Sequence, residues 1–111
     1  MNKLLSMLGL ARRAGKLQMG FDASIEAIRS GNAYGVLASC DLSDKTFKNL
    51  KFEADKFGIP AIRMDETTES LSIATGRKAG IAAVCDKGFM EAISKMNATI
   101  TPPQIERMDT K

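Results

Sequence analysis

The side chains that could carry out chemistry near neutral pH are few in this sequence. It contains no histidine, so general acid–base catalysis would fall to carboxylates, lysines or the single tyrosine, whose ordinary pKa values lie far from neutrality. The two cysteines, Cys40 and Cys85, lie far apart and form no CxxC pair, so the common zinc and redox motifs are missing. We therefore expect two buried thiols in a reducing cytosol and no metal site.

Motifs that bind nucleotide phosphates or activate a serine are also missing. Gly15 and Gly20 have the spacing of the two P-loop glycines, but Phe21 and Asp22 follow where a lysine and a hydroxyl residue are required. No GxGxxG segment indicates a dinucleotide site, and no GxSxG segment indicates a serine hydrolase. We therefore predict a protein that is not an enzyme and that uses no cofactor.

Three aspartates, Asp41, Asp44 and Asp86, are the remaining candidates for a catalytic carboxylate cluster. Each comes just before a predicted helix. At that position a carboxylate accepts hydrogen bonds from free backbone amides and meets the positive end of the helix dipole. We therefore expect these aspartates to cap helices or to be solvated, rather than to act in catalysis.

The basic residues are more informative in their positions than in their total. The net charge is only +3 and the isoelectric point is about 9.0. The first 20 residues carry no acidic side chain, and their basic residues are Lys3, Arg12, Arg13 and Lys16. A second basic pair, Arg77 and Lys78, lies between Gly76 and Gly80, which predicts a mobile basic loop.

These two basic segments suit a phosphate backbone if the fold brings them together. Lys16, Gly20 and the start of the following helix would present a lysine, a flexible backbone and exposed amide donors at one edge. With Arg77 and Lys78 at the same edge, the chain would carry a two-part cationic clamp. The alternative is that these charges are solvated separately on unrelated surfaces.

Helical and strand patterns alternate along the chain, and glycines separate most of them. Helical spacing of apolar residues predicts helices at 2–14, from Gly20 to Gly31, at 46–57, from Thr67 or Thr68 to Gly76, and at 89–96. Short apolar runs predict strands at 16–19, 34–39, 59–64 and 80–85, with Pro60 favouring an edge position or the start of a strand. We expect Phe21 or Asp22 to cap the second helix, and Phe57 and Ile73 to face the core.

This alternation predicts an α/β fold, namely a three-layer α/β/α sandwich with a small mixed sheet. The chain has 111 residues, 44% of them hydrophobic, which suffices for one core. We predict a single domain at 1–97 and a flexible or loosely docked tail at 98–111. The apolar run at the start is too short for a signal peptide or a membrane span, so we expect no membrane partner.

Several segments, taken in order, resemble one known family. They are Leu8–Leu17, Gly20, Val36–Thr46, Lys56–Pro60, Leu71, Thr75–Lys78 and Ile81–Val84, and they cover nearly everything before the tail. The chain resembles the kink-turn-binding family of archaeal ribosomal protein seven-Ae and eukaryotic L-thirty, specifically its small bacterial YlxQ-like members. Each segment alone is weakly specific, but their order and spacing are specific together.

The resemblance implies an α/β/α sandwich that binds kink-turns or similarly bent RNA in ribosomes or other ribonucleoproteins. Family members carry Gly-x-Asn-Glu-x-x-Lys after the first strand, and this segment enters the groove that the bend widens. In this chain the glycine is Gly20, whereas Asp22, Ala23 and Glu26 stand in place of the asparagine, glutamate and lysine. An ionised Asp22 only accepts hydrogen bonds, Ala23 offers no polar group, and Glu26 is negative. The base-reading positions therefore depart from the family.

We predict a cytoplasmic, non-catalytic RNA-binding protein with altered or reduced kink-turn specificity and with ribosomal components as further partners. The predicted RNA-binding residues are Lys16, Gly20, Asp22, Arg77 and Lys78, joined by Arg12 and Arg13 if these face the same edge. The alternative is a protein–protein interaction module with weak or no RNA binding, which opposite placement of Lys16 and Arg77–Lys78 would favour. A small nucleotide- or metabolite-binding enzyme is a third interpretation, which a deep apolar pocket lined by perturbed carboxylates would support.

Overall fold

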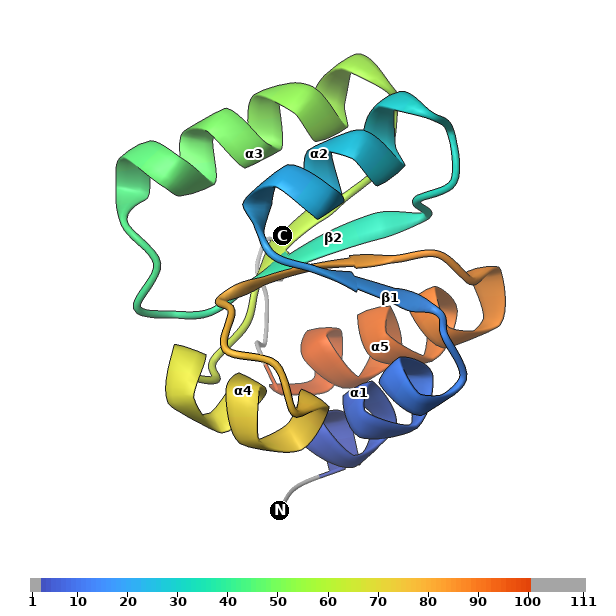
Figure 1. The fold of residues 1–111 in the computed structure, drawn as a ribbon, viewed down its shortest axis with the longest axis vertical. Coiled ribbons are helices and arrows are strands. Elements are labelled where there is room, and N and C mark those ends of the chain that lie inside the picture. The colour runs from blue at the N-terminus through green and yellow to red at the C-terminus, as the bar shows by residue number, and fades with distance from the viewer. Residues whose placement is uncertain (1–2, 101–111) are drawn as a thin grey trace, which may run out of the picture.

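Helices and strands alternate throughout the structure, a computed structural model that describes residues 3–100 (Figure 1). The helices are α1 (Lys3–Arg13), α2 (Phe21–Arg29), α3 (Asp44–Lys56), α4 (Thr68–Thr75) and α5 (Lys87–Ile100). The strands are β1 (Leu17–Met19), β2 (Gly35–Ala38), β3 (Ala61–Arg63) and β4 (Ile81–Val84). The order of elements is the one that the sequence predicts.

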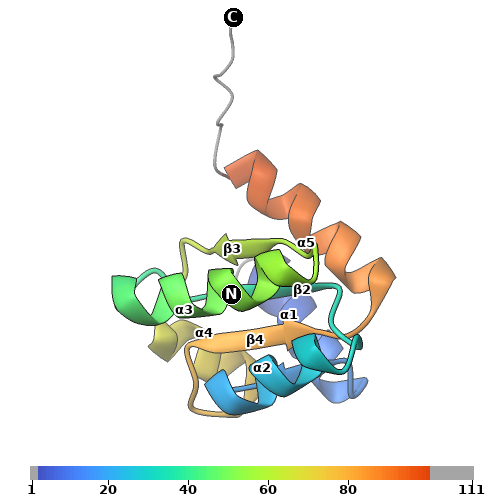
Figure 2. The same ribbon diagram turned by 90° about the horizontal axis from the view of Figure 1, so that it is seen from above.

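The four strands form one mixed sheet in the order β1-β4-β2-β3. β4 runs antiparallel to both of its neighbours, while β2 and β3 are parallel. Helices α1, α4 and α5 cover one face of the sheet, and α2 and α3 cover the other (Figure 1). Seen from above, α2 lies over β4 and β1, and α3 lies over β2 and β3 (Figure 2). The predicted three-layer α/β/α sandwich with a small mixed sheet is therefore confirmed.

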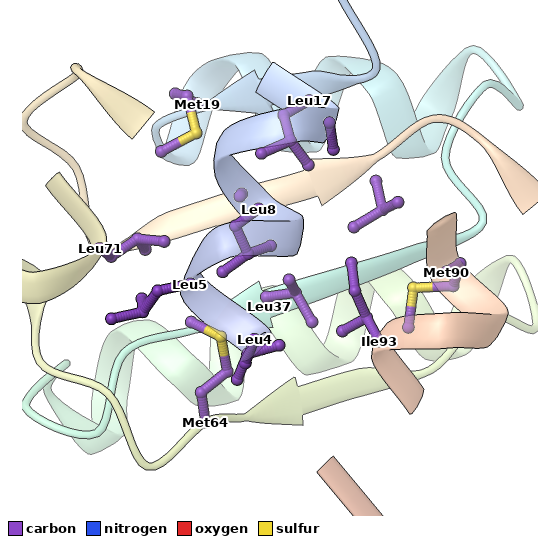
Figure 3. Close-up of a cluster of buried hydrophobic side chains, with 13 residues drawn as sticks. Leu4, Leu5, Leu8, Leu17, Met19, Leu37, Met64, Leu71, Met90 and Ile93 are labelled. Atoms are coloured by element: carbon purple, nitrogen blue, oxygen red, sulfur yellow. The ribbon is translucent and has the colours of Figure 1, made fainter. Parts of the chain in front are cut away.

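Two hydrophobic cores lie on the two faces of the sheet because strand side chains alternate between faces. Ala82 and Val84 of β4 face α1, α4 and α5, where Leu8, Leu71 and Ile93 are fully buried (Figure 3). Ile81 and Ala83 of the same strand face the opposite core, whose other members include Ile28, Val36, Leu50 and Ala54. Burial on both faces explains why β2 and β4 are continuous apolar runs in the sequence.

Two residues that were expected in the core are exposed instead. Ile73 is 69% exposed because it lies two positions, or about 200° around α4, from the fully buried Leu71. Phe57 is 47% exposed because it is the C-cap of α3, where the chain leaves the helical path. Pro60 immediately precedes β3, an edge strand, as expected.

The last helix extends beyond its predicted end at Met96 and closes at Ile100. Residues 101–111, most of the predicted tail at 98–111, lie outside the described residues. Within residues 3–100, none of the helices is both long enough and apolar enough to span a bilayer.

β2 approaches α5 closely at Gly35, its first residue. A Cβ at this position would overlap the Met90 sulfur and would lie 2.7 Å from the Met90 methyl carbon. Met90 itself is 5% exposed and belongs to the core beneath α1 and α5 (Figure 3). A closed core gives this side chain little room to move, so close approach of β2 to α5 requires glycine here.

Gly35→Ala is expected to lower the free energy of unfolding by about 1–3 kcal/mol, because the added methyl group overlaps Met90 in a packed core. Urea denaturation followed by far-ultraviolet circular dichroism measures this loss. The matched test is the same substitution in a Met90→Ala background, where the loss should be smaller because the obstruction is gone. An equal loss in both backgrounds would contradict the overlap with Met90.

Candidate nucleic-acid interface

The strand register brings three loops to one end of the sheet. Gly20, which follows β1, donates its amide to the Ile81 carbonyl at 2.8 Å. Ser39, which follows β2, donates its amide to the Gly80 carbonyl at 2.8 Å. We name this end the Gly20 edge and define it as residues 20–22, 39–41 and 76–80. In Figure 1 it lies on the side where α2 begins and where the loop from α4 enters β4.

The start of α2 leaves its backbone amides free for a ligand. Its N-cap is Gly20, with φ 101° and ψ 162°, and no side chain caps it. The expectation that Phe21 or Asp22 caps this helix is wrong, because both lie inside its first turn. Only glycine adopts this φ without strain, and its lack of a side chain leaves the first amides accessible. Such a helix start attracts anions, although the exposed carboxylate of Asp22 opposes them there.

A network of hydrogen bonds between hydroxyl groups and a carboxylate connects the Gly20 edge to the first residue of α4. The Thr68 amide and hydroxyl both donate to Asp41 Oδ1, at 3.0 and 2.8 Å. The Thr68 hydroxyl is also 2.8 Å from that of Ser39, which is fully buried. Because the Thr68 hydrogen is used on Asp41, Ser39 is the donor in this second bond. The hydroxyls of Ser39 and Thr68 lower the pKa of Asp41.

The three predicted capping aspartates have different surroundings. Asp86 caps α5, since its carboxylate accepts from the Phe89 amide at 2.9 Å. Asp41 binds the first residue of α4 and not the helix that follows it in the chain. Ser43 caps that following helix, α3. Asp44 lies in the first turn of α3, 3.4 Å from the Arg63 guanidinium.

The loop that carries Arg77 and Lys78 is fixed at both ends. Gly76 closes α4 in the left-handed conformation and donates to the Ser72 carbonyl at 2.8 Å, and the Ala79 amide donates to the Ser72 hydroxyl at 3.2 Å. A Cβ at Gly80 would lie 2.7 Å from the Thr68 hydroxyl and 2.8 Å from that of Ser39. These contacts hold the loop backbone in place, whereas the flanking glycines predict a mobile loop. Arg77 and Lys78 are exposed and form no ion pair within the described part of the chain.

The two-part clamp required the fold to bring Lys16 to the same edge as Arg77 and Lys78, and the backbone does not meet this condition. The carbonyl of Lys16 accepts from the Cys85 amide, at the far end of β4 from Ile81 and Gly20. Arg12 and Arg13 are the last two residues of α1, and a Cβ at Gly9 would lie 3.7 Å from the Arg13 guanidinium and 3.0 Å from the Ala74 carbonyl oxygen of α4. Lys16 and Gly20 lie at the two ends of β1, so they are about 13 Å apart although they are close in sequence. The register thus brings the loop of Arg77 and Lys78 to the same end of the sheet as Gly20 and Asp22, while the Lys16 backbone lies at the opposite end.

Neither cysteine is fully buried, which corrects the expectation of two buried thiols. Cys40 is exposed at the Gly20 edge, and Cys85 is half-buried beside Lys16. Burial raises the pKa of the Cys85 thiol, and the nearby Lys16 charge opposes this shift. Among residues 3–100, no three acidic or cysteine side chains cluster so as to hold a metal ion.

Comparison with known proteins decides the family. No family-wide sequence model matches the chain. The RNA-binding protein YlxQ of Enterococcus faecium is 28% identical over 94 residues, which is 85% of this chain and 90% of that protein. The RNA-binding protein YlxQ of Bacillus subtilis strain 168 is 34% identical over 84 residues, 75% of this chain and 83% of that protein. This chain belongs to the YlxQ family.

Solved structures share the fold of this chain. A protein of unknown function from Bacillus halodurans C superposes with a TM-score of 0.82 at 29% identity, covering 86% of this chain and 97% of that one. The Giardia lamblia 15.5kD RNA binding protein superposes with a TM-score of 0.69 at 14% identity, covering 87% and 83%. The second likeness concerns the fold alone. The predicted resemblance to YlxQ-like proteins is confirmed.

Sequence reasoning named Asp41 but assigned it to the helix that follows it and did not pair it with Thr68. The two residues are 27 positions apart in the chain, and no local pattern links them. The one available signal was a polar cluster, Ser39 to Asp41, directly after a buried strand. It predicted a loop and a cap but could not name the partner.

Asp41→Asn is expected to weaken the dependence of stability on pH in acid. Hydrogen bonds lower the pKa of Asp41 in the folded state, so the unfolded chain takes up its proton first as the pH falls. The stabilisation is therefore complete above the ordinary value of 3.8 and is lost as the pH falls through the lower folded-state pKa. Urea denaturation midpoints from about pH 5 downwards measure the slope.

The control for this experiment is Asp65→Asn, which removes an exposed carboxylate outside the Ser39–Thr68–Asp41 network. It should leave a steeper acid dependence than Asp41→Asn does. Equal slopes for the two variants would show that the network does not favour the ionised form of Asp41.

Proposed function

We propose that this chain is a non-catalytic RNA-binding protein that contacts RNA through the Gly20 edge. The observation that carries the proposal is that two exposed cations, Arg77 and Lys78, lie in a loop at the same end of the sheet as the uncapped start of α2. Cations and free backbone amides bind phosphate oxygens and fix the register of a nucleic acid strand. Both YlxQ relatives are named RNA-binding proteins, which supports the same ligand.

Bent, structured RNA such as a kink-turn is the proposed ligand class. A regular RNA duplex has a groove too narrow for side chains, whereas a bend opens it to the start of a helix. At that point this chain offers backbone amides and the acceptor-only carboxylate of Asp22. Phosphate contacts therefore supply most of the affinity, and specificity for kink-turns is reduced.

A ribosome or another ribonucleoprotein in the cytoplasm is the proposed setting. Cys40 and Cys85 are both free thiols, and Cys40 is exposed. Exposed free thiols suit a reducing compartment. Ribosomal components are proposed as the neighbours of the bound RNA.

Replacing Arg77 and Lys78 by alanine together is expected to weaken binding of a kink-turn RNA. The salt slope of log Kobs should fall by about 0.7–0.9 for each phosphate that the variant no longer neutralises. Fluorescence anisotropy with a labelled kink-turn RNA and a straight duplex of equal length, at two salt concentrations, measures both effects. Reduced kink-turn specificity predicts that the wild-type affinities for the two RNAs differ little.

The matched control removes the same charge from another surface. Lys48 and Lys51 are exposed on α3, away from the α4–β4 loop, and Lys51 makes only a surface ion pair with Asp55 at 3.2 Å. Replacing these two lysines by alanine should leave RNA affinity nearly unchanged. Equal losses in the two double variants would mean that net charge, not the Gly20 edge, determines binding.

A protein–protein interaction module is the second candidate, and one observation favours it. Lys16 lies at the opposite end of the sheet from Arg77 and Lys78, so the basic residues form no single patch. A groove of about 230 Å³ between α2 and α3 also exposes apolar surface of Phe21 and Phe52. Negligible RNA binding by the wild type at both salt concentrations would favour this candidate over the first.

A further inference from the structure

A polar cleft runs along α2 at the open edge of the sheet, beyond the residues of the Gly20 edge. It has a volume of about 490 Å³, and Gln18, Glu26, Asn32, Tyr34 and Cys85 are among the residues that line it. Gln18 is the middle residue of β1, and its side chain faces α2 because Leu17 and Met19 face the opposite core. The cleft thus lies between an edge strand, one face of α2 and the turn that leads into β2.

The fold fixes the backbone of the cleft residues but leaves several of their side-chain groups available to a ligand. Tyr34 is 49% exposed, while its amide is fixed to the Val84 carbonyl at 2.7 Å. Asn32 donates from its side-chain amide to the Ser30 hydroxyl at 3.0 Å, which leaves its side-chain oxygen free. Within residues 3–100, Gln18, Glu26 and the Tyr34 hydroxyl have no side-chain hydrogen bond or ion pair. An aromatic ring and three polar groups therefore face one solvent-filled space.

The two ends of the cleft carry opposite charges. The carboxylate of Glu26 lies on the α2 side. Lys16 lies at the other end, bonded through its carbonyl to the Cys85 amide, and its charge partly opposes the rise in the pKa of that thiol that burial causes. A ligand with hydrogen-bond donors at one end and a negative charge at the other matches this arrangement.

We infer that this cleft binds an unpaired guanine base, with Tyr34 stacking on the ring and Glu26 accepting from its Watson–Crick edge. Guanine is the base that presents two adjacent donors, N1–H and the 2-amino group, to a carboxylate. Uracil presents one N–H between two oxygens, and adenine and cytosine present an unprotonated ring nitrogen that a carboxylate repels. The side-chain amides of Gln18 and Asn32 supply donors for guanine O6 or N7, and Lys16 meets the phosphate.

The inference rests on the proposed function where the guanine belongs to RNA held at the Gly20 edge. Ala23, in the first turn of α2, lines the same cleft as Glu26 one turn later, so the cleft begins beside the Gly20 edge. A strand bound at that edge can therefore place a neighbouring, unstacked base on Tyr34. Recognition of single-stranded bases by an aromatic ring and edge hydrogen bonds is common in RNA-binding proteins. A free guanine nucleotide carries the same chemistry.

Tyr34 is itself the probe, because the chain has one tyrosine and no tryptophan. We expect GMP to quench the tyrosine fluorescence of the full chain more strongly than AMP, CMP or UMP, after correction for nucleotide absorbance with free tyrosine amide. Glu26→Gln keeps the shape of the side chain but loses the carboxylate, and it should weaken the GMP effect by about tenfold. Equal quenching by all four nucleotides, unchanged in Glu26→Gln, would overturn the guanine assignment.

Stacking is tested by anisotropy of a labelled, single-stranded oligonucleotide with one guanine. Tyr34→Ala should weaken binding by about tenfold, whereas Tyr34→Phe keeps the ring and should bind as the wild type does. Quenching by the oligonucleotide but not by GMP would assign the cleft to an RNA base, and quenching by GMP alone would assign it to a free nucleotide. Tyr34→Ala binding as tightly as the wild type would overturn the stacking role.

The Arg77→Ala, Lys78→Ala variant separates this inference from the proposed function. It should bind kink-turn RNA more weakly yet keep the full quenching by GMP. No quenching by any nucleotide, with RNA binding that still depends on Arg77 and Lys78, would overturn the cleft and leave the proposed function intact. Quenching by GMP without RNA binding that depends on Arg77 and Lys78 would overturn the proposed function and leave the cleft assignment intact.

Discussion

The pairing of β4 with both β1 and β2 is the constraint on which the rest of the structure depends. Its side chains alternate between the two cores, and all four of its residues are buried. Slipping β4 by one residue would exchange Ile81 and Ala83 with Ala82 and Val84, so the register is strongly specified. The same register aligns the start of β4 with the ends of β1 and β2. Packing in the cores therefore decides which loops share an edge.

Local chemistry accounts for how much of the fold could be predicted from the sequence. Gly15, Gly31, Gly58 and Gly76 all have positive φ values and follow the ends of helices, where glycine is the residue that best closes a helix. Apolar runs of four residues marked the two strands buried on both faces. The order of strands could not be predicted this way, because β4 enters the sheet between β1 and β2, which are far from it in the chain. Ile73 shows a further limit, since a short helix with a weak pattern leaves its buried face undecided.

The sequence predicted the candidate site only where residues of one local segment also lie together in the fold. Gly20 and Arg77–Lys78 were found as glycine-flanked basic segments, and the strand register brings them together. Lys16 was grouped with Gly20 because the two are close in sequence, but an intervening strand sends them to opposite ends of the sheet. Asp41 was assigned to the nearest helix, yet it binds Thr68, which is 27 residues away. Long-range contacts of this kind have no local signature.

The departures from the family at positions 22, 23 and 26 have different consequences once the fold is known. Asp22 lies at the start of α2, where it opposes phosphate, but Ala23 and Glu26 face the cleft beside Gln18 and Tyr34. Ala23 lines the cleft with a small side chain that offers a ligand no polar group. A carboxylate at 26 is unfavourable to phosphates and favourable to the donor edge of guanine. In the proposed arrangement, phosphate binding and base selection therefore belong to separate residues: salt dependence follows Arg77 and Lys78, and base preference follows Glu26 and Tyr34.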